Sequence, residues 1–175
     1  MGEPAHSRVD SIPKYAIPEV ERRWLVDLEA VGPLKELTFR EIEDLYFPGT
    51  GLRLRKLRDP SGKVLFKFCK KYGKSSALTE SITNLYLSEA EYAILSQLGG
   101  QAVCKRRSAI AGGALDLYGG PRNFAVFEAE FDSEAEAMAY IPPGFVREEI
   151  TNNASYTGPA LALREDNPVS HVKSP

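Results

Sequence analysis

The chain contains little histidine, little cysteine and no long hydrophobic run. Its two histidines, His6 and His171, lie near the two ends among polar and proline residues, so the sequence does not indicate Ser–His or Cys–His catalysis or a histidine-rich zinc site. Its two cysteines, Cys69 and Cys104, are far apart and do not form a metal-binding pair. They are interpreted as free thiols in a reducing compartment, with a disulfide as the alternative. The chemistry that remains is that of carboxylates, lysine and arginine, for which hard cations are the matching metals.

Length and composition predict a single domain. A chain of 175 residues, of which 43% are hydrophobic, can bury a sizeable core. The expected boundaries are a flexible leader over 1–14, one domain over 15–163 and a flexible tail over 164–175. No apolar run approaches the roughly 20 residues of a membrane span, and the first residues contain no apolar signal-peptide core, so the cytoplasm is the expected location. The net charge of −2 and the pI near 5.8 indicate neither a nucleic-acid nor a membrane partner.

Several segments place a charged residue at every second position, which is the period at which a strand returns to the same face. The sign of the charge is sorted by segment, in the pairs Glu19 and Glu21, Glu128 and Glu130, Arg53 and Arg55, and Lys105 and Arg107. Taken singly, the acid pairs could be solvated strand faces, and the base pairs could be solubilising charge or contacts to a DNA backbone. Taken together, the sorting predicts a site that holds cations on one side and an anion on the other.

Turn and capping signals divide the chain into about eight strands and a few helices. The strands are expected over 16–26, 40–47, 52–58, 63–71, 78–87, 101–110, 114–118 and 124–131. Helices are expected near 34–37, after the capping boxes that begin at Ser88 and Ser133, and after a cap at Thr151. This order predicts an antiparallel sheet or a closed barrel. A barrel of about eight strands can enclose a small ligand, and charges on its inner face require water, metal or a polyanion.

These segments, in this order, resemble the CYTH superfamily, also called the triphosphate tunnel metalloenzymes, and in particular its short bacterial members. The resemblance covers about Glu19 to Leu163. The acidic motifs that carry it are Glu19-Val20-Glu21-Arg22-Arg23 as ExExK, Glu80 in an acidic strand, Asp116 in a second acidic strand and Glu128-Ala129-Glu130 as ExE. The basic motifs are Leu52-Arg53-Leu54-Arg55 as RxR, Lys70 as a tunnel lysine and Lys105-Arg106-Arg107 as KxR. A C-terminal signature follows around Pro142-Pro143-Gly144, Glu148-Glu149-Ile150-Thr151, Tyr156 and Ala160-Leu161-Ala162.

The resemblance implies an α+β, mainly β fold, a closed eight-stranded antiparallel barrel whose lumen binds a triphosphate. The implied ligands of Mg²⁺ or Mn²⁺ are Glu19, Glu21, Asp116, Glu128 and Glu130. The implied phosphate ligands are Arg23, Arg53, Arg55, Lys70, Lys105 and Arg107. A metal-activated water would attack the terminal phosphorus, with Glu19, Glu21, Arg23 and Glu149 as the catalytic group.

The sequence departs from the family pattern at four positions. Arg23 replaces the family lysine, Ile82 and Ala114 stand where relatives carry acidic or polar residues, and Gly158 stands where asparagine is expected. Three functions therefore stay open: hydrolysis of a small-molecule triphosphate, with inorganic triphosphate favoured over thiamine triphosphate or a nucleotide; cyclisation of ATP to cyclic AMP; and polyphosphate or nucleotide binding without efficient turnover. The sequence is compatible with a monomer or a homodimer.

Overall fold

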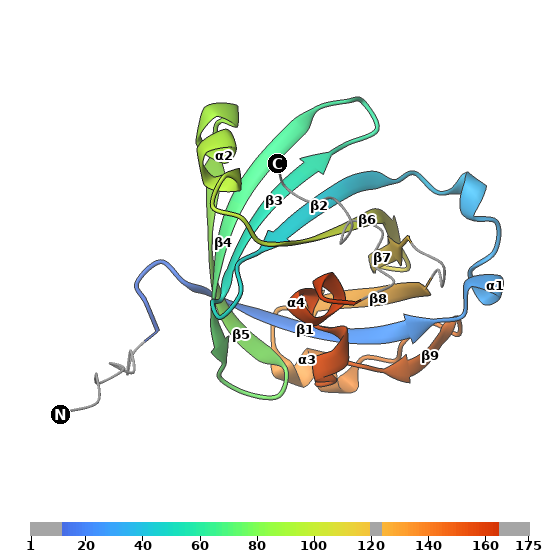
Figure 1. The fold of residues 1–175 in the computed structure, drawn as a ribbon. Coiled ribbons are helices and arrows are strands. Elements are labelled where there is room, and N and C mark those ends of the chain that lie inside the picture. Colours follow the sequence, from blue (N-terminus) through green and yellow to red (C-terminus); the bar gives the residue numbers. More distant parts are fainter. Residues whose placement is uncertain (1–11, 120–123, 165–175) are drawn as a thin grey trace.

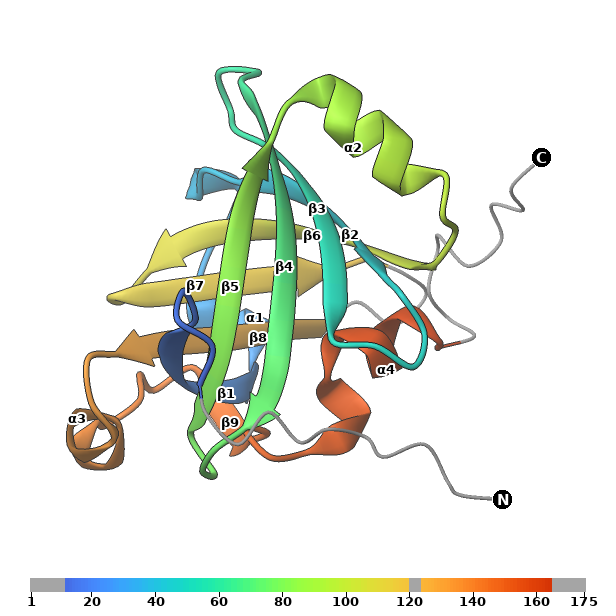
Figure 2. The same ribbon diagram turned by 90° about the vertical axis from the view of Figure 1, so that its left-hand side faces the viewer.

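A closed antiparallel barrel forms the body of the computed structural model, which describes residues 12–119 and 124–164. Its strands are β1 (Ile17–Val26), β2 (Arg40–Tyr46), β3 (Leu52–Arg58), β4 (Val64–Lys74), β5 (Thr79–Leu87), β6 (Gln101–Ile110), β7 (Gly113–Tyr118) and β8 (Phe124–Phe131). They are hydrogen-bonded in the order β5-β4-β3-β2-β6-β7-β8-β1, and pairing of β1 with β5 closes the ring (Figures 1 and 2). The expected eight-stranded barrel is therefore confirmed.

Strand β1 closes the barrel because it changes partners along its length. Its first residues pair with β5, with Glu19 opposite Glu80, and its later residues pair with β8, with Glu21 opposite Glu130. The end of β1 also pairs with a ninth strand, β9 (Val146–Glu149), which the sequence pattern did not predict. The closure brings carboxylates from three strands to one part of the wall.

Short elements cover the apolar outer faces of the strands. Buried Trp24 and Phe127 pack beneath the segment that contains helix α3 (Glu134–Ala139) and β9. Buried Leu115 and Leu117 pack against helix α1 (Leu28–Val31) and the 3₁₀ turn η1 (Leu34–Glu36). Two of the apolar clusters of the fold therefore lie on the outer side of the strands, which leaves part of the inner face free to carry charge.

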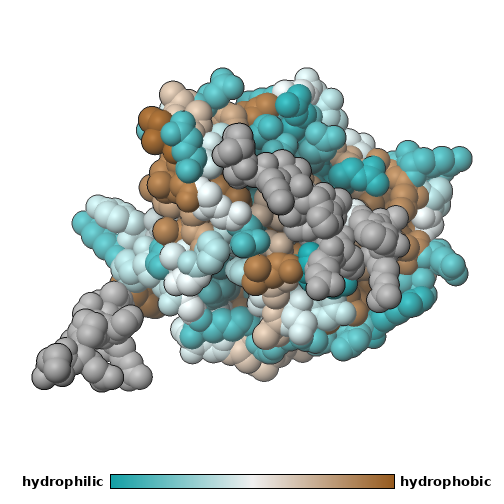
Figure 3. Space-filling view, viewed as in Figure 1, coloured by the Kyte–Doolittle hydropathy of each residue, from teal (hydrophilic) through white to brown (hydrophobic). Residues whose placement is uncertain are grey.

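Helix α2 (Glu89–Ser96) lies across the outer side of β3, β4 and β5, where the rings of Tyr92 and Phe66 are 4.5 Å apart. The capping box expected at Ser88 is present, with Glu91 bonded back to the Ser88 backbone N–H, and Ser133 caps α3. Part of the other face of α2 is apolar and exposed, and brown side chains gather over this helix at the upper left of Figure 3.

Helix α4 (Gly158–Ala162) lies in one end of the barrel (Figure 1). Its buried Leu161 packs against inward-facing Val103, Tyr118 and Val126. A Cβ atom on Gly158 would overlap the hydroxyl oxygen of Tyr46, so glycine allows α4 to approach this closely. The helix therefore closes one end of the lumen. The glycine at position 158, where the family pattern has asparagine, allows this close packing.

The C-terminal caps differ from the expectation. Thr151 begins no helix; its hydroxyl accepts a hydrogen bond from the Arg23 backbone N–H and donates one to Glu149. The caps are instead Asn153, for the 3₁₀ turn η2 (Ala154–Tyr156), and Thr157, for α4. Most of the expected leader (1–14) and tail (164–175) lies outside the described residues. Within the described ranges, no helix is long and apolar enough to cross a membrane.

Candidate functional site

The register of the strands brings most of the expected site residues to the inner face of the barrel. Directly opposed residues of antiparallel strands share a face. Arg107 lies opposite Asp116, Arg23 opposite Glu128, and Glu21 opposite Glu130. The expected site residues that share this face are Glu19, Glu21, Arg23, Arg53, Arg55, Lys105, Arg107, Asp116, Glu128 and Glu130.

Strands β6, β7 and β8 carry a connected set of ion pairs around Asp116. The Asp116 side chain is 0% exposed and accepts hydrogen bonds from Lys105 Nζ at 2.5 Å and from Arg107 Nε and Nη2, each at 2.6 Å. Arg107 Nη2 also donates to Glu128, which accepts a further bond from Arg23 Nε at 3.2 Å. Burial opposes ionisation of Glu128, but the charges of Arg107, Lys105 and Arg23 outweigh it and hold the pKa of that carboxyl well below its usual range.

A second group of ion pairs, on β2 and β3, contains an acid that the sequence interpretation missed. Asp44 is buried and accepts bonds from Arg55 Nε at 2.6 Å and Nη2 at 2.7 Å. Burial alone would raise its pKa, but Arg55 and then Arg53 reverse this and lower it to about 2. Arg53 Nε lies 3.8 Å from Asp44 Oδ1 and has no hydrogen-bond partner in the part of the chain that the structure describes. Asp44 could have been found from the alternation of β2, because it lies out of phase with the exposed Glu41 and Glu43.

The acidic wall formed by β1, β5 and β8 is less fully paired. Lys71 Nζ lies 3.1 Å from Glu19 Oε2 and 3.0 Å from Glu80 Oε2. Among the described residues, neither Glu21 nor Glu130 has an ion-pair or side-chain hydrogen-bond partner within bonding distance. Burial first, and then the charge of Glu128, raise the pKa of Glu21 to about 7. Negative charge is therefore in excess at this wall.

No protein-family model and no curated protein matches the chain. Two solved structures of NE1496 resemble it: one is described as a hypothetical protein (25% identity, covering 83% of this chain and 98% of that one, TM-score 0.50) and one as an inorganic triphosphatase (24% identity, covering 83% and 95%, TM-score 0.50). A third structure, of a proposed adenylate cyclase from Vibrio parahaemolyticus, has 20% identity, covers 70% of this chain and 81% of that one, and has a TM-score of 0.43. The chain has the CYTH-type tunnel fold.

The expected tunnel lysine, Lys70, is not in the tunnel. Lys70 lies opposite Leu52 and Thr83 on the outer face, and Lys71 faces the lumen instead. The cause is the connection between β3 and β4, which spans five residues (59–63) and pairs Arg53 with Cys69. A connection of four residues (59–62), as the sequence suggested, would have shifted the register by one and turned Lys70 inward.

Glu149, expected in the catalytic group, is also outside the tunnel. It lies opposite the outward-facing Trp24 and accepts two bonds from Arg22, at 3.0 Å to Nε and 2.6 Å to Nη2. The hydrogen bonds from Arg22 lower the pKa of Glu149 despite the opposing effect of burial. The Arg22 guanidinium stacks 4.8 Å from the Trp24 ring centre, so this pair fastens β9 to the outside of β1.

Ile82 and Ala114, two of the positions that depart from the family pattern, face the lumen. Ile82 is buried on the inner face of β5, opposite Lys71 on one side and Ile17 on the other. Ala114, on β7, lies opposite Glu128 of β8. The two positions at which the resemblance implied acidic or polar side chains are therefore apolar positions of the tunnel wall itself.

The donor set fits Mg²⁺ or Mn²⁺ in kind, because these cations prefer carboxylate oxygens. The uncommitted carboxylates of Glu21 and Glu130 face each other across two adjacent strands. Nevertheless, no three His, Cys, Asp or Glu side chains within the described residues converge into a ready metal site. A cation in this tunnel would require some carboxylates to exchange their Lys or Arg partners.

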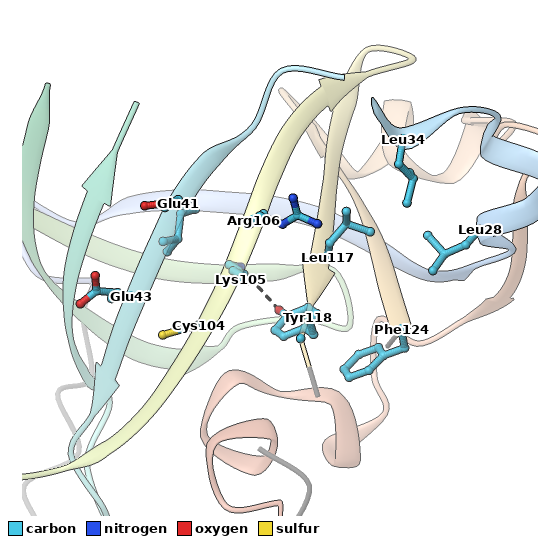
Figure 4. Close-up of a pocket in the computed structure, with 12 residues that line it drawn as sticks. Leu28, Leu34, Glu41, Glu43, Cys104, Lys105, Arg106, Leu117, Tyr118 and Phe124 are labelled. Atoms are coloured by element: carbon cyan, nitrogen blue, oxygen red, sulfur yellow. Dashed lines mark hydrogen bonds between the residues drawn. The ribbon is translucent and has the colours of Figure 1, made fainter. Parts of the chain in front are cut away.

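A cavity of about 370 Å³ lies along strands β2, β6 and β7, next to the covering segment that contains α1 and η1 (Figure 4). Its lining includes Glu41, Arg106 and Leu117 from the outward-facing positions of β2, β6 and β7, together with Leu28 and Leu34 from the covering segment. The lining also includes Ile42, Lys105 and Tyr118 from inward-facing positions of the same strands, so the cavity shares Lys105 with the lumen but none of its guanidinium groups Arg53, Arg55 and Arg107.

Proposed function

We propose that this chain is a metal-dependent hydrolase that releases phosphate from a triphosphate, preferably inorganic triphosphate, inside the tunnel. The observation that carries this proposal is the concentration of guanidinium, ammonium and carboxylate groups on the inner face of a closed barrel. Phosphoryl transfer depends mainly on positioning and on neutralising charge, which is what such an inner face can provide.

The basic side chains would hold the anion. Two strands supply these bases, β3 with Arg53 and Arg55 and β6 with Lys105 and Arg107, and both strands pair with β2. The guanidinium groups match phosphate oxygens in bidentate geometry. Among the described residues, the buried Nε of Arg53 has no hydrogen-bond partner, although the Arg53 guanidinium also interacts with Asp44 and Tyr46. A triphosphate would satisfy this donor and share the other bases with Asp44 and Asp116.

The carboxylates of Glu21 and Glu130 would hold Mg²⁺ or Mn²⁺, with Glu19 as a further oxygen donor. A metal bound there supplies charge neutralisation to the phosphate and a more acidic water molecule. Arg23 remains protonated near neutral pH, so its contribution is electrostatic and it cannot accept a proton from that water. It binds Glu128 through Nε, which orients the guanidinium along the tunnel wall.

Inorganic triphosphate is the first substrate to test, since NE1496 is described as an inorganic triphosphatase. Inorganic triphosphate, ATP and thiamine triphosphate would each be incubated with the protein in Mg²⁺, Mn²⁺ or EDTA, and released phosphate would be measured. The expected result is rapid release from inorganic triphosphate that requires metal. Equal release in EDTA, or no release from any of the three by folded protein, would contradict the proposal.

Polyphosphate binding without turnover is the second candidate, and the ion pairs favour it. Lys105 and Arg107 already neutralise Asp116, and Arg23 and Arg107 already neutralise Glu128. A binding protein needs no assembled metal site, so calorimetric binding of inorganic triphosphate without phosphate release would support this candidate over the hydrolase.

A further inference from the structure

Among the described residues, Lys71 is the inward-facing base that bridges acids of two different strands on the acidic wall of β1, β5 and β8. Its ammonium lies 3.1 Å from Glu19 on β1 and 3.0 Å from Glu80 on β5, two strands that pair only over residues 17–20 and 79–82. An ammonium has three N–H donors, and the two carboxylates use two of them. The third donor is therefore available to a ligand in the lumen.

This bridge can be rearranged more easily than the other ion pairs of the tunnel. The Lys71 side chain is 32% exposed, whereas that of Lys105 is 6% exposed and that of Asp116 is fully buried. Lysine is a point charge on a flexible four-carbon chain, while the Arg107 fork is fixed to Asp116 by two parallel bonds. Lys71 can thus turn from carboxylate to phosphate without leaving a buried acid unpaired.

We propose that Lys71 couples the binding of the divalent cation to the binding of the polyphosphate, an inference that rests on the proposed function. In the ligand-free tunnel the Lys71 ammonium takes the place of a cation between Glu19 and Glu80. When a polyphosphate enters, its charge draws the ammonium away, and the two carboxylates become available to a divalent cation next to Glu21, which has no ion-pair partner among the described residues. The cation therefore binds weakly alone and more tightly when the anion is present.

The coupling acts in both directions. By linkage, a divalent cation must strengthen polyphosphate binding by the same factor by which polyphosphate strengthens cation binding. Couplings of this kind typically amount to about 5–150-fold. Removing the ammonium of Lys71 should therefore increase the affinity of the protein for the cation alone and reduce the coupling, although it also removes one phosphate contact.

The test measures binding rather than turnover. Free Mn²⁺ is followed by electron paramagnetic resonance, and imidotriphosphate, which resists hydrolysis, is titrated by calorimetry in EDTA and in saturating Mn²⁺. The proteins compared are the wild type, Lys71→Met, Lys71→Arg and the control Lys67→Met. Lys67 faces the lumen from the same strand, and its ammonium lies 5.1 Å from the Tyr86 ring centre rather than on an acid. Chelation of Mn²⁺ by the anion in solution is the same for all four proteins and cancels from their ratios.

In Lys71→Met, the affinity for Mn²⁺ alone should rise about tenfold and the coupling should fall by a similar factor, within the range typical of such couplings. Lys71→Arg keeps the bridging charge and should stay within about twofold of the wild type, as should Lys67→Met. In the wild type itself, imidotriphosphate in EDTA should shift the ¹⁵N resonance of the Lys71 ammonium, a result that does not depend on any variant folding.

An unchanged Mn²⁺ affinity in folded Lys71→Met, or an unshifted Lys71 resonance upon anion binding, would overturn the coupling. If the wild type still binds both ligands and releases phosphate, the proposed function survives that result. If the wild type binds neither imidotriphosphate nor Mn²⁺, both the function and the coupling are wrong.

Discussion

The wall formed by β6, β7 and the Glu128 part of β8 and the wall formed by β1, β5 and the Glu130 end of β8 both carry acids into the tunnel, but they neutralise them differently. On the first wall, Asp116 and Glu128 are each bound by at least two basic side chains. On the second wall, a single ammonium serves Glu19 and Glu80, and Glu21 has no partner within bonding distance among the described residues. The first wall is electrostatically complete, and the second has negative charge left for a cation.

The difference indicates a division of labour between the walls. Buried and multiply bonded ion pairs fix the positions of their members, because breaking them leaves an uncompensated charge. Such a wall can present Arg107 and Lys105 to an anion in a constant geometry. The partly exposed wall, in contrast, can rearrange at low cost and is suited to taking up a ligand.

The largest expected effect, a loss of stability, comes from removing the Asp116 charge on the first wall. Asp116→Asn would leave the buried charges of Lys105 and Arg107 without their shared counter-charge, so the free energy of unfolding should fall by about 3–5 kcal/mol. Urea unfolding measures this directly. The control is Glu149→Gln, which removes an outward-facing ion pair with Arg22 and should cost no more than about 1 kcal/mol. Equal losses in the two variants would show that the Asp116 pairs are not structural.

The next prediction concerns Glu130, which lies opposite Glu21 on the second wall, and it follows from the proposed function. Glu130→Gln removes a carboxylate charge with little change in shape, so metal-dependent phosphate release should fall about 100-fold while the protein stays folded. Glu41→Gln is the matched control, because Glu41 is an exposed strand carboxylate on the outer face. Full activity in Glu130→Gln would remove Glu130 from the site.

A smaller effect, which depends on pH, should come from Glu21. Its pKa in the folded protein is about 7, raised from 4.5 by burial and by Glu128, so the folded state binds this proton more tightly than the unfolded chain does. The stability that protonation provides is complete below about pH 4.5 and is lost as the pH rises to about 7. In EDTA, Glu21→Gln should therefore be more stable than the wild type by about 2 kcal/mol at pH 8 and by clearly less at pH 5. Urea unfolding at both pH values tests this, and a difference independent of pH would contradict it.

The fold could be predicted from the sequence to a large extent because its signals are local. Alternation gave the strands, and the capping boxes at Ser88 and Ser133 begin helices where expected. The fit of α4 into the barrel could not be predicted, since the contact between Gly158 and Tyr46 joins residues far apart in the chain. The same holds for β9, which exists only through its pairing with β1.

The site could be predicted as a set of charge types but not as a set of partners. Alternation placed Glu21, Arg107 and Glu128 on one face, and the register bears this out. Which base binds which acid depends on how neighbouring strands are offset, and a lone acid such as Asp44 gives no paired signal. For Lys70, one additional residue in the connection before β4 was enough to reverse the face.

That reversal gives the smallest predicted effect and the clearest check on the register. Lys70→Ala changes a side chain on the outer face, whose ammonium lies 5.9 Å from the Tyr72 ring centre, so affinity for imidotriphosphate should change by less than about twofold and stability by no more than about 0.5 kcal/mol. Lys71→Ala removes an inward-facing ammonium and should weaken anion binding several-fold in the same calorimetric titration. If Lys70→Ala had the larger effect, the offset between β3 and β4 would be wrong by one residue, and with it the pairing of Lys71 with Glu19 and Glu80.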